Sequence, residues 1–435
     1  AILATPADGG LKGVGLEPSA SQSPGQSIRR SILIVLLPFA AGYTLSYVFR
    51  TVNAVLAPHL VRDIGLSAAD LGLITAAYFL AFAAFQVPLG LLIDRFNPSR
   101  VQGILLMSAG LGALVFAWGE QRETLILGRA MIGLGVAGGL MASLKAIVLW
   151  FPRQRLPLFN GLFLAFGGLG AMAATVPVEV ALGVTDWRGV YVVLGLATFA
   201  SAVLVFFLVP TRPMDPPSGG PLKQFRDLGH VYRDRLFWRI APVCVVTPGT
   251  TMAIQGLWAG PWLRDVAGLD RAAVANHLFI MAVAMTVGFA ITALLTDILY
   301  RRFAIRPITV LGCGLVALLL VQAGVVAELI SIVMLLWISF GALASFISLS
   351  FAILSQHFPA EYSGRANTGL NVMVFSCSFG AQYAIGAIID VWPPLADGNY
   401  QPEAYQAAFG TMLVIEVTAL LWFFAAGHLL PAKQR

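Results

Sequence analysis

The sequence contains few charged residues. Asp, Glu, Lys and Arg make up 11% of its 435 positions, while hydrophobic residues make up 58%. A soluble globular domain carries roughly 25% charged residues. The composition therefore excludes an ordinary soluble domain and indicates a chain that lies mostly in lipid. The formal net charge of +6 does not indicate nucleic-acid binding, because most basic residues lie between apolar runs, where they set membrane orientation.

Cysteine and histidine are also scarce. Cys244, Cys313 and Cys377 lie within apolar runs, and no C-x-x-C pair or Cys/His cluster is present, which argues against a disulfide framework or a zinc site. The five histidines are scattered near the ends of apolar runs and form no nucleophile–base or metal-binding motif. We therefore expect neither an enzyme nor a cofactor. The absence of a G-x-x-x-x-G-K-[ST] loop argues against ATP as the energy source.

Long apolar runs dominate the rest of the chain. A membrane span needs about 20 mostly apolar residues. Twelve runs meet this requirement, near 31–58, 68–92, 101–118, 124–151, 157–184, 188–210, 237–262, 272–298, 307–326, 329–356, 366–391 and 405–428. The sequence thus predicts an all-α membrane protein with twelve transmembrane helices.

Basic residues are unevenly distributed between the two sides of these spans. The side that carries both tails holds 19 Lys and Arg residues, the other side holds 5, and Arg50, Arg129 and Lys145 lie within spans. Because basic residues mark the cytoplasmic side, both termini are expected in the cytoplasm. The expected order is a flexible cytoplasmic tail (1–30), a six-helix bundle (31–210), a cytoplasmic linker with an amphipathic helix (211–236), a second six-helix bundle (237–430) and a short cytoplasmic tail (431–435).

An internal repeat divides the chain into two halves. Asp94 follows the second span and Asp297 follows the eighth, at an offset of 203 residues. The Phe-Pro pairs at 151–152 and 358–359, together with Asn160 and Asn367, match at an offset of 207 residues. Two pseudo-symmetric six-helix halves are the simplest interpretation, and proteins of this architecture bind ligands near the membrane midplane, between the halves.

Several motifs resemble those of one family. "GLLIDRFNPSR" resembles the loop signature of the major facilitator superfamily, and "LGRAMIGLGVAGG" resembles its R-x-x-x-G-x-G signature. "YVFRTVNAVLAPHL", "FQVPLGLLID" and "LKAIVLWFP" together resemble the anion:cation symporter branch and related organic-anion carriers. The resemblance implies the major facilitator fold and a cavity faced by Arg50 and Lys145. Phe49 and Gly167 depart from that branch, which often has an acidic residue and a Gln there.

Two in-span cations are the main candidates for substrate binding. Arg50 lies about 18 residues into the first span, which corresponds to ~27 Å of helical rise. A charge at that depth costs at least ~2.5 kcal/mol, so Arg50 should face a cavity or a partner. The alternatives are an anionic substrate or a structural ion pair. Lys145 either faces the same cavity or extends its ammonium to the interface, and no acidic residue is expected at its depth.

Arg129 and Glu179 are expected near the same end of adjacent spans. The simpler interpretation is a structural ion pair between them. Glu179 is also the candidate proton carrier of the first half, since burial can raise the pKa of a carboxyl group. Glu416 lies midway along the last span, and its position predicts no function.

The second half has no midspan cation and offers polar and aromatic side chains instead. Such amides either bind substrate or join helices. The substrate-binding candidates of this half are Gln255, Trp258, Asn371 and Gln382. Two residues near Arg50 in the first span, Tyr47 and Asn53, are further candidates. In the seventh span, Pro248 and Gly249 form a pair that either breaks the helix or only kinks it.

Four charged residues mark two helix junctions on the cytoplasmic side. Asp94, Arg95, Asp297 and Arg301 are expected either to join the halves in one conformation or only to anchor the topology. The resemblance favours the first role.

Together these features predict a secondary transporter of the inner (cytoplasmic) membrane, expected to be monomeric. It would move a small organic anion, with protons as the expected coupling ion. The alternatives are a facilitator or exporter of a larger or drug-like molecule, and a membrane sensor that does not transport.

Overall fold

The computed structural model describes residues 24–211, 229, 231–395 and 398–429. Within this part of the chain, twelve helices are long and apolar enough to cross a membrane. They confirm the twelve spans and the all-α fold class expected from the apolar runs. Most of the expected linker at 211–236 lies outside the described residues. Residues 24–30, expected in the tail, are helical.

The first half contains six spans, several of which consist of more than one helix. Its elements are α1 (Pro24–Ser31), η1 (Ile32–Leu36), α2 (Leu37–Thr51), α3 (Asn53–Ile64), α4 (Ala68–Arg95), α5 (Pro98–Ala117), α6 (Arg122–Val136), α7 (Gly139–Trp150), η2 (Arg153–Arg155), α8 (Leu156–Ala173), α9 (Val176–Ala181), α10 (Trp187–Val203) and η3 (Leu204–Leu208).

The second half repeats this arrangement. Its elements are α12 (Arg235–Ala253), η4 (Ile254–Trp258), α13 (Ala259–Asp265), α14 (Arg271–Phe303), α15 (Pro307–Val326), η5 (Ile330–Ile332), α16 (Val333–Ala344), η6 (Ser345–Ser348), α17 (Leu349–His357), α18 (Ala360–Ile389), α19 (Pro402–Ala425) and η7 (Ala426–Leu429). Pro248 and Gly249 lie inside α12, which continues through them into the π-helical turn η4, so the pair does not break the helix.

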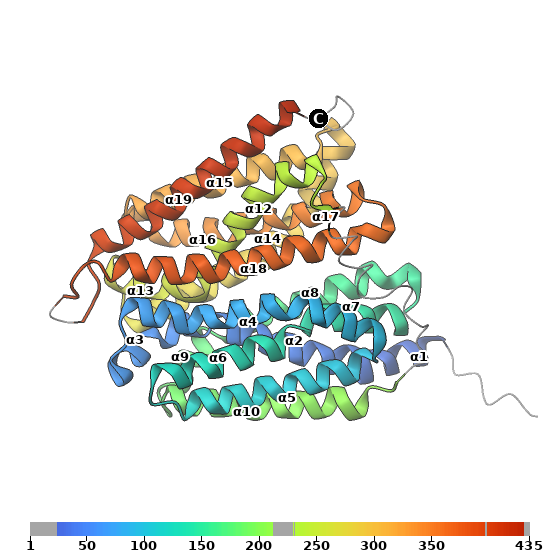
Figure 1. Ribbon diagram of the computed structural model, residues 1–435, viewed down its shortest axis with the longest axis horizontal. Coiled ribbons are helices and arrows are strands. Elements are labelled where there is room, and N and C mark those ends of the chain that lie inside the picture. The colour runs from blue at the N-terminus through green and yellow to red at the C-terminus, as the bar shows by residue number, and fades with distance from the viewer. Residues whose placement is uncertain (1–23, 212–228, 230, 396–397, 430–435) are drawn as a thin grey trace, which may run out of the picture.

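The two halves lie against each other as separate bundles (Figure 1). The first half, blue to green, lies below the second half, yellow to red, and α4 runs beside α18 where they meet. The start of α1 and the end of α19 lie at the right of this view. We call that end of the molecule the tail side and the opposite end the far side.

The buried apolar residues show where the halves are joined. One large cluster contains side chains from both halves, including Phe79 and Phe82 on α4 and Phe375 on α18. A second cluster contains first-half residues alone, from Val35 to Val209. Because burial of apolar surface drives association, the shared cluster joins the halves, and the second cluster stabilises the first half by itself.

Backbones of the two halves approach closely near the far side. A Cβ atom added to Gly260 on α13 would lie 1.9 Å from the carbonyl oxygen of Ala54 on α3. Only glycine leaves room for this approach. The far side is therefore closed by direct contact between α3 and α13.

Candidate functional site

Arg50 lies where the two halves meet. Its guanidinium carbon is 4.5 Å from the ring centroid of Tyr47 on the same helix and 5.9 Å from that of Phe82 on α4. Phe375 on α18, in the other half, is 5.2 Å away and stacks on Phe82 at a centroid distance of 4.0 Å. Ring faces attract a cation within about 6 Å. Arg50 is therefore held by aromatic side chains from both halves.

No carboxylate neutralises this guanidinium. Among the described residues, no Asp or Glu oxygen lies within ion-pair distance of Arg50. Its Nε is buried and has no hydrogen-bond partner, and its main electrostatic neighbours are Tyr78, Tyr47 and Tyr43. Rings compensate a desolvated cation only in part. The side chain therefore retains the capacity to bind an anion.

The sequence of α2 places this group on one face. Tyr43, Tyr47 and Arg50 are spaced four and three residues apart, so they follow one another along the helix surface. The Tyr43 and Tyr47 rings pack edge to face at 5.2 Å. A Cβ atom on Gly167 of α8 would lie 2.8 Å from the Tyr47 ring. The glycine that departs from the family branch thus makes room for the tyrosine beside Arg50.

Asn53 takes part in a buried hydrogen-bond network. Its Nδ2 donates to Thr75 at 2.9 Å, and its Oδ1 accepts from the Tyr191 hydroxyl at 2.8 Å. Arg129 donates to the same hydroxyl at 3.2 Å and to the carbonyl oxygen of Phe49 at 2.8 Å. Both amide atoms of Asn53 are thus engaged within the first half. Its contacts are those of a structural residue, and its expected role in substrate binding stays a prediction.

The expected ion pair between Arg129 and Glu179 does not form. Arg129 is fully buried in the network just described, which joins α2, α6 and α10. Glu179 on α9 faces the second half instead, where its Oε1 lies 3.9 Å from Nε of Arg271 on α14. The expectation was wrong because both residues lie near the far side but point in different directions.

Arg271 also contacts a histidine that the sequence did not single out for a role. Its Nη1 lies 3.3 Å from Nε2 of His59 on α3. Burial, followed by the nearby Arg271 and Arg62, lowers the pKa of His59 below its ordinary value. A cavity of about 20 Å³ lies beside this group and is lined by Pro58, Glu179, Arg264 and Arg271, among others. This volume holds about one water molecule.

Lys145 has an acidic partner at its depth, contrary to expectation. Its Nζ donates to Asp94 Oδ1 at 2.9 Å and to the carbonyl oxygen of Ile93 at 2.7 Å. Asp94, at the end of α4, therefore balances its charge within the first half. A contact of Lys145 with substrate remains a prediction that requires this pair to open.

The other charged residues at the helix junctions make contacts within their own half. Asp297 accepts from Arg301 at 2.8 Å, one turn along α14. The guanidinium of Arg95 lies 5.8 Å from the ring of Phe96. The charged residues of both helix junctions lie on the tail side. Their expected role in joining the halves stays a prediction, which concerns another conformation of the transporter.

The polar candidates of the second half lie in different surroundings. Gln255 donates weakly to Met285 Sδ at 3.6 Å, and its neighbour Gly256 packs against the backbone of Arg50. Trp258 is fully buried and donates from Nε1 to the carbonyl oxygen of Gln382 at 3.2 Å. The Gln382 side chain is buried without a partner, and Asn371 is half-buried. Gln255 therefore adjoins, through its chain neighbour Gly256, the backbone of Arg50.

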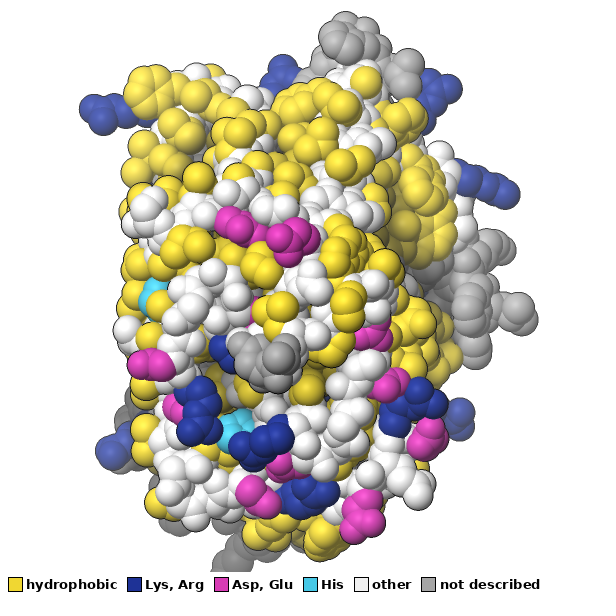
Figure 2. Space-filling model, turned by 90° about the vertical axis from the view of Figure 1, so that its left-hand side faces the viewer, with side chains coloured by type: hydrophobic (Ala, Val, Ile, Leu, Met, Phe, Trp, Pro, Cys, Tyr) yellow, Lys and Arg dark blue, Asp and Glu magenta, His cyan; other side chains and the backbone are white. Residues whose placement is uncertain are grey.

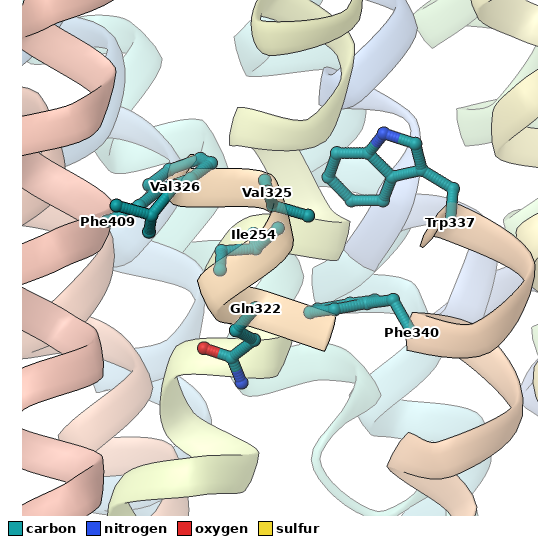
Figure 3. A pocket seen from close by; sticks show the side chains of 7 residues that line it. All are labelled: Ile254, Gln322, Val325, Val326, Trp337, Phe340 and Phe409. Atoms are coloured by element: carbon teal, nitrogen blue, oxygen red, sulfur yellow. The ribbon is translucent and has the colours of Figure 1, made fainter. Parts of the chain in front are cut away.

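Glu416 lies away from these residues, inside the second half. It is fully buried, and Gln322 Nε2 on α15 donates to its Oε1 at 3.2 Å. Gln322 also lines a cavity of about 10 Å³ together with Trp337, Phe340 and others, and its amide points away from their rings (Figure 3). The contact links α15 to α19.

Metal ligands do not gather anywhere in the described ranges. No group of three or more His, Cys, Asp or Glu side chains among these residues could hold a metal ion. Charged side chains do gather at the end face of the bundle. Figure 2 looks onto the far side, where basic, acidic and histidine side chains lie mainly in the middle and lower part of the face.

Comparison with known proteins finds relatives that are named as transporters. A probable sulfoacetate transporter, SauU, from Cupriavidus necator is 26% identical over 366 residues, which cover 78% of this chain and 84% of that protein. A hexuronate transporter from Escherichia coli K12 is 25% identical over 290 residues, covering 61% of this chain and 65% of that protein.

Among solved structures, a bacterial homologue of the human lysosomal transporter Spinster superposes with a TM-score of 0.74. It is 17% identical, and the match covers 95% of this chain and 99% of that one, which establishes the fold. The model of the Major Facilitator Superfamily matches residues 39–382. Twelve spans, two repeated halves and this match lead to one conclusion: the chain belongs to the Major Facilitator Superfamily and is a membrane transporter rather than an enzyme.

Proposed function

We propose that this transporter moves a small organic anion by alternating access, and that Arg50 binds the anionic group. The observation that carries the proposal is a guanidinium at the junction of the halves, surrounded by aromatic rings and without a carboxylate partner. A carboxylate or sulfonate can accept two parallel hydrogen bonds from a guanidinium, which offsets the cost of desolvation. The two relatives are named as a probable sulfoacetate transporter and a hexuronate transporter, which supports the same substrate class.

We further propose proton-coupled uptake through the inner membrane, with both termini in the cytoplasm. The distribution of 19 basic residues on one side against 5 on the other supports this orientation. The far side then faces outward, and the tail side faces the cytoplasm. Glu179 is the proposed proton carrier, because it lies at the outer end between the halves and beside a cavity that water can enter.

Binding measurements test the role of Arg50. A thermal-shift screen of purified protein against small organic acids, including sulfoacetate and hexuronates, identifies a ligand, and calorimetry then gives its affinity. Arg50→Gln should weaken binding by about 2–5 kcal/mol, roughly 30- to several-thousand-fold, the usual cost of truncating one member of a buried charge pair. Arg50→Lys should restore part of this loss, since an ammonium lacks the planar fork.

The matched control is Arg302→Gln, which removes an exposed cation at the tail-side end of α14. It should leave the affinity unchanged. Binding by Arg50→Gln within a few-fold of the unmodified protein would refute the anion site. Counterflow of the labelled ligand into proteoliposomes tests transport itself, because a sensor binds its ligand without exchanging it.

A further inference from the structure

The contact between His59 and Arg271 joins the two halves on the far side. His59 is buried on α3 of the first half, and Arg271 begins α14 of the second half. Their side-chain nitrogens lie 3.3 Å apart. Arg271 also faces Glu179 on α9 at 3.9 Å. One guanidinium of the second half thus contacts two elements of the first half, next to the backbone contact between Gly260 and Ala54.

This contact requires a neutral imidazole. A guanidinium has only donors, so Nε2 of His59 must accept the hydrogen bond from Arg271. A protonated imidazole has no acceptor and repels the guanidinium. Burial and the charge of Arg271 already lower the pKa of His59 in this closed arrangement. Protonation of His59 is therefore incompatible with the contact.

The other charges around His59 are held by their own partners. On α3 itself, Asp63 accepts from Arg62 at 2.9 Å and from Trp187 Nε1 at 3.0 Å. On α13, Arg264 is bonded to Asp265 at 2.5 Å. The charged residues near this contact on the neighbouring segments are Asp270, which precedes α14, Arg271 at the start of α14, and Glu179 on α9. Among the residues of this contact, His59 alone ordinarily titrates near neutral pH. The histidine of α14, His277, bonds the backbone oxygen of Ala273 within its own helix.

Protons from the solution on the far side can reach the contact between His59 and Arg271. The side chain of Arg271 is 62% exposed. The adjacent cavity of about 20 Å³ is lined by residues of both halves, Pro58 and Glu179 on one side and Arg271 on the other. A single water molecule fits there.

We propose that His59 is a proton-binding site whose protonation releases Arg271 and favours separation of the halves on the far side. This inference deepens the proposed proton coupling and rests on its assumption that the far side opens. It adds His59 as a second proton-binding residue beside the proposed carrier Glu179, and it makes opening itself depend on the outer pH.

Linkage fixes the direction of the effect. In the closed state the pKa of His59 lies below its ordinary value of about 6.5, and in an open, hydrated state it returns toward that value. The open state therefore binds the proton more tightly. Well above pH 6.5 the proton has no influence, and the open state gains population as the pH falls through this value toward the lower pKa of the closed state. Each unit of pKa difference between the states changes their ratio up to about tenfold.

Distances between spin labels on the far side test the proposal without any substrate. The labels are placed at Val184 and Val391, which are 90% and 74% exposed in the first and second half, in a protein whose native cysteines are replaced by alanine. In the labelled protein without further substitutions, the population with a long distance between the two labels should grow severalfold between pH 8 and pH 5. His59→Gln, which can still accept from Arg271, should remove this growth and keep the far side closed at pH 5.

Two further variants complete the experiment. Arg271→Gln, at a largely exposed position, should raise the open population already at pH 8 and flatten its pH dependence. His277→Gln is the matched control, because His277 is also buried on α14 but bonds the backbone oxygen of Ala273 at 2.8 Å within its own helix. It should retain the full pH response.

Three outcomes would overturn the proposal: distances that do not change between pH 8 and pH 5, a pH response that survives His59→Gln, or an equal loss of response in His277→Gln. All three are independent of Arg50. Failure of the anion site would appear as unchanged ligand affinity in Arg50→Gln and would leave these distances unaffected.

Discussion

Asp390 provides a sensitive test of how the halves are joined. This residue follows α18 in the second half, and its carboxylate oxygens accept from the backbone nitrogens of Ala68 at 2.8 Å and Ala69 at 3.0 Å, at the start of α4 in the first half. The first turn of a helix has unpaired N–H groups and attracts negative charge. The start of α4 is therefore fully bonded only while the halves are together.

The two hydrogen bonds set the free energy that the substitution Asp390→Asn should cost. Hydrogen bonds to a charged group contribute about 1.5–3 kcal/mol, but Asp390 is exposed and the substitution Asp390→Asn leaves one acceptor oxygen. We therefore expect a loss of about 1 kcal/mol, which shifts the balance between closed and open far sides roughly fivefold.

Hydrogen exchange measures this shift directly. Mass spectrometry of the peptide that contains Ala68 and Ala69 should show exchange about fivefold faster in Asp390→Asn, since protection reports the opening equilibrium. Asp186→Asn is the control. Asp186 bonds the nitrogen of Gly189 at 2.8 Å at the start of α10, inside one half, so its loss should accelerate exchange there alone. Unchanged exchange at Ala68 and Ala69 in Asp390→Asn would refute the proposed contact between the halves.

Two further predictions concern closure and orientation. Gly260→Ala should open the far side, because its Cβ would lie 1.9 Å from the oxygen of Ala54, whereas Gly380→Ala, with no atom within 4 Å of the added Cβ, should not; the spin-label pair described above measures both, and equal distances in the two variants would contradict the close packing. A cysteine at Ser218 should not react with a membrane-impermeant thiol reagent applied to intact cells, because the distribution of basic residues assigns the linker to the cytoplasm; strong labelling would reverse the orientation.

The sequence by itself determined the architecture. Helices in lipid must satisfy their backbone groups internally, so the length of each apolar run decides whether it spans the membrane. The same reasoning selected Arg50, because a charge so deep in an apolar run is costly wherever it points. In the structure Arg50 has no carboxylate partner among the described residues and lies against aromatic rings, and its role in substrate binding stays a prediction.

The tertiary structure decided which charges meet. Depth along a span can be counted from the sequence, but the direction of a side chain depends on how its helix is rotated and packed. Arg129 and Glu179 lie near the same end, yet Arg129 bonds Tyr191 and Glu179 faces Arg271 in the other half. Lys145 and Asp94 come from different helices, and their contact follows from the packing of α7 beside α4.

The contacts on the far side show most clearly what cannot be predicted from the sequence. His59 and Arg271 are 212 positions apart in the chain, and Asp390 is 322 positions from Ala68. Composition and hydropathy are local properties, so they carry no information about such pairs. The association of the two bundles brings these residues together, and the energy of that association is spread over many apolar contacts rather than encoded in a motif.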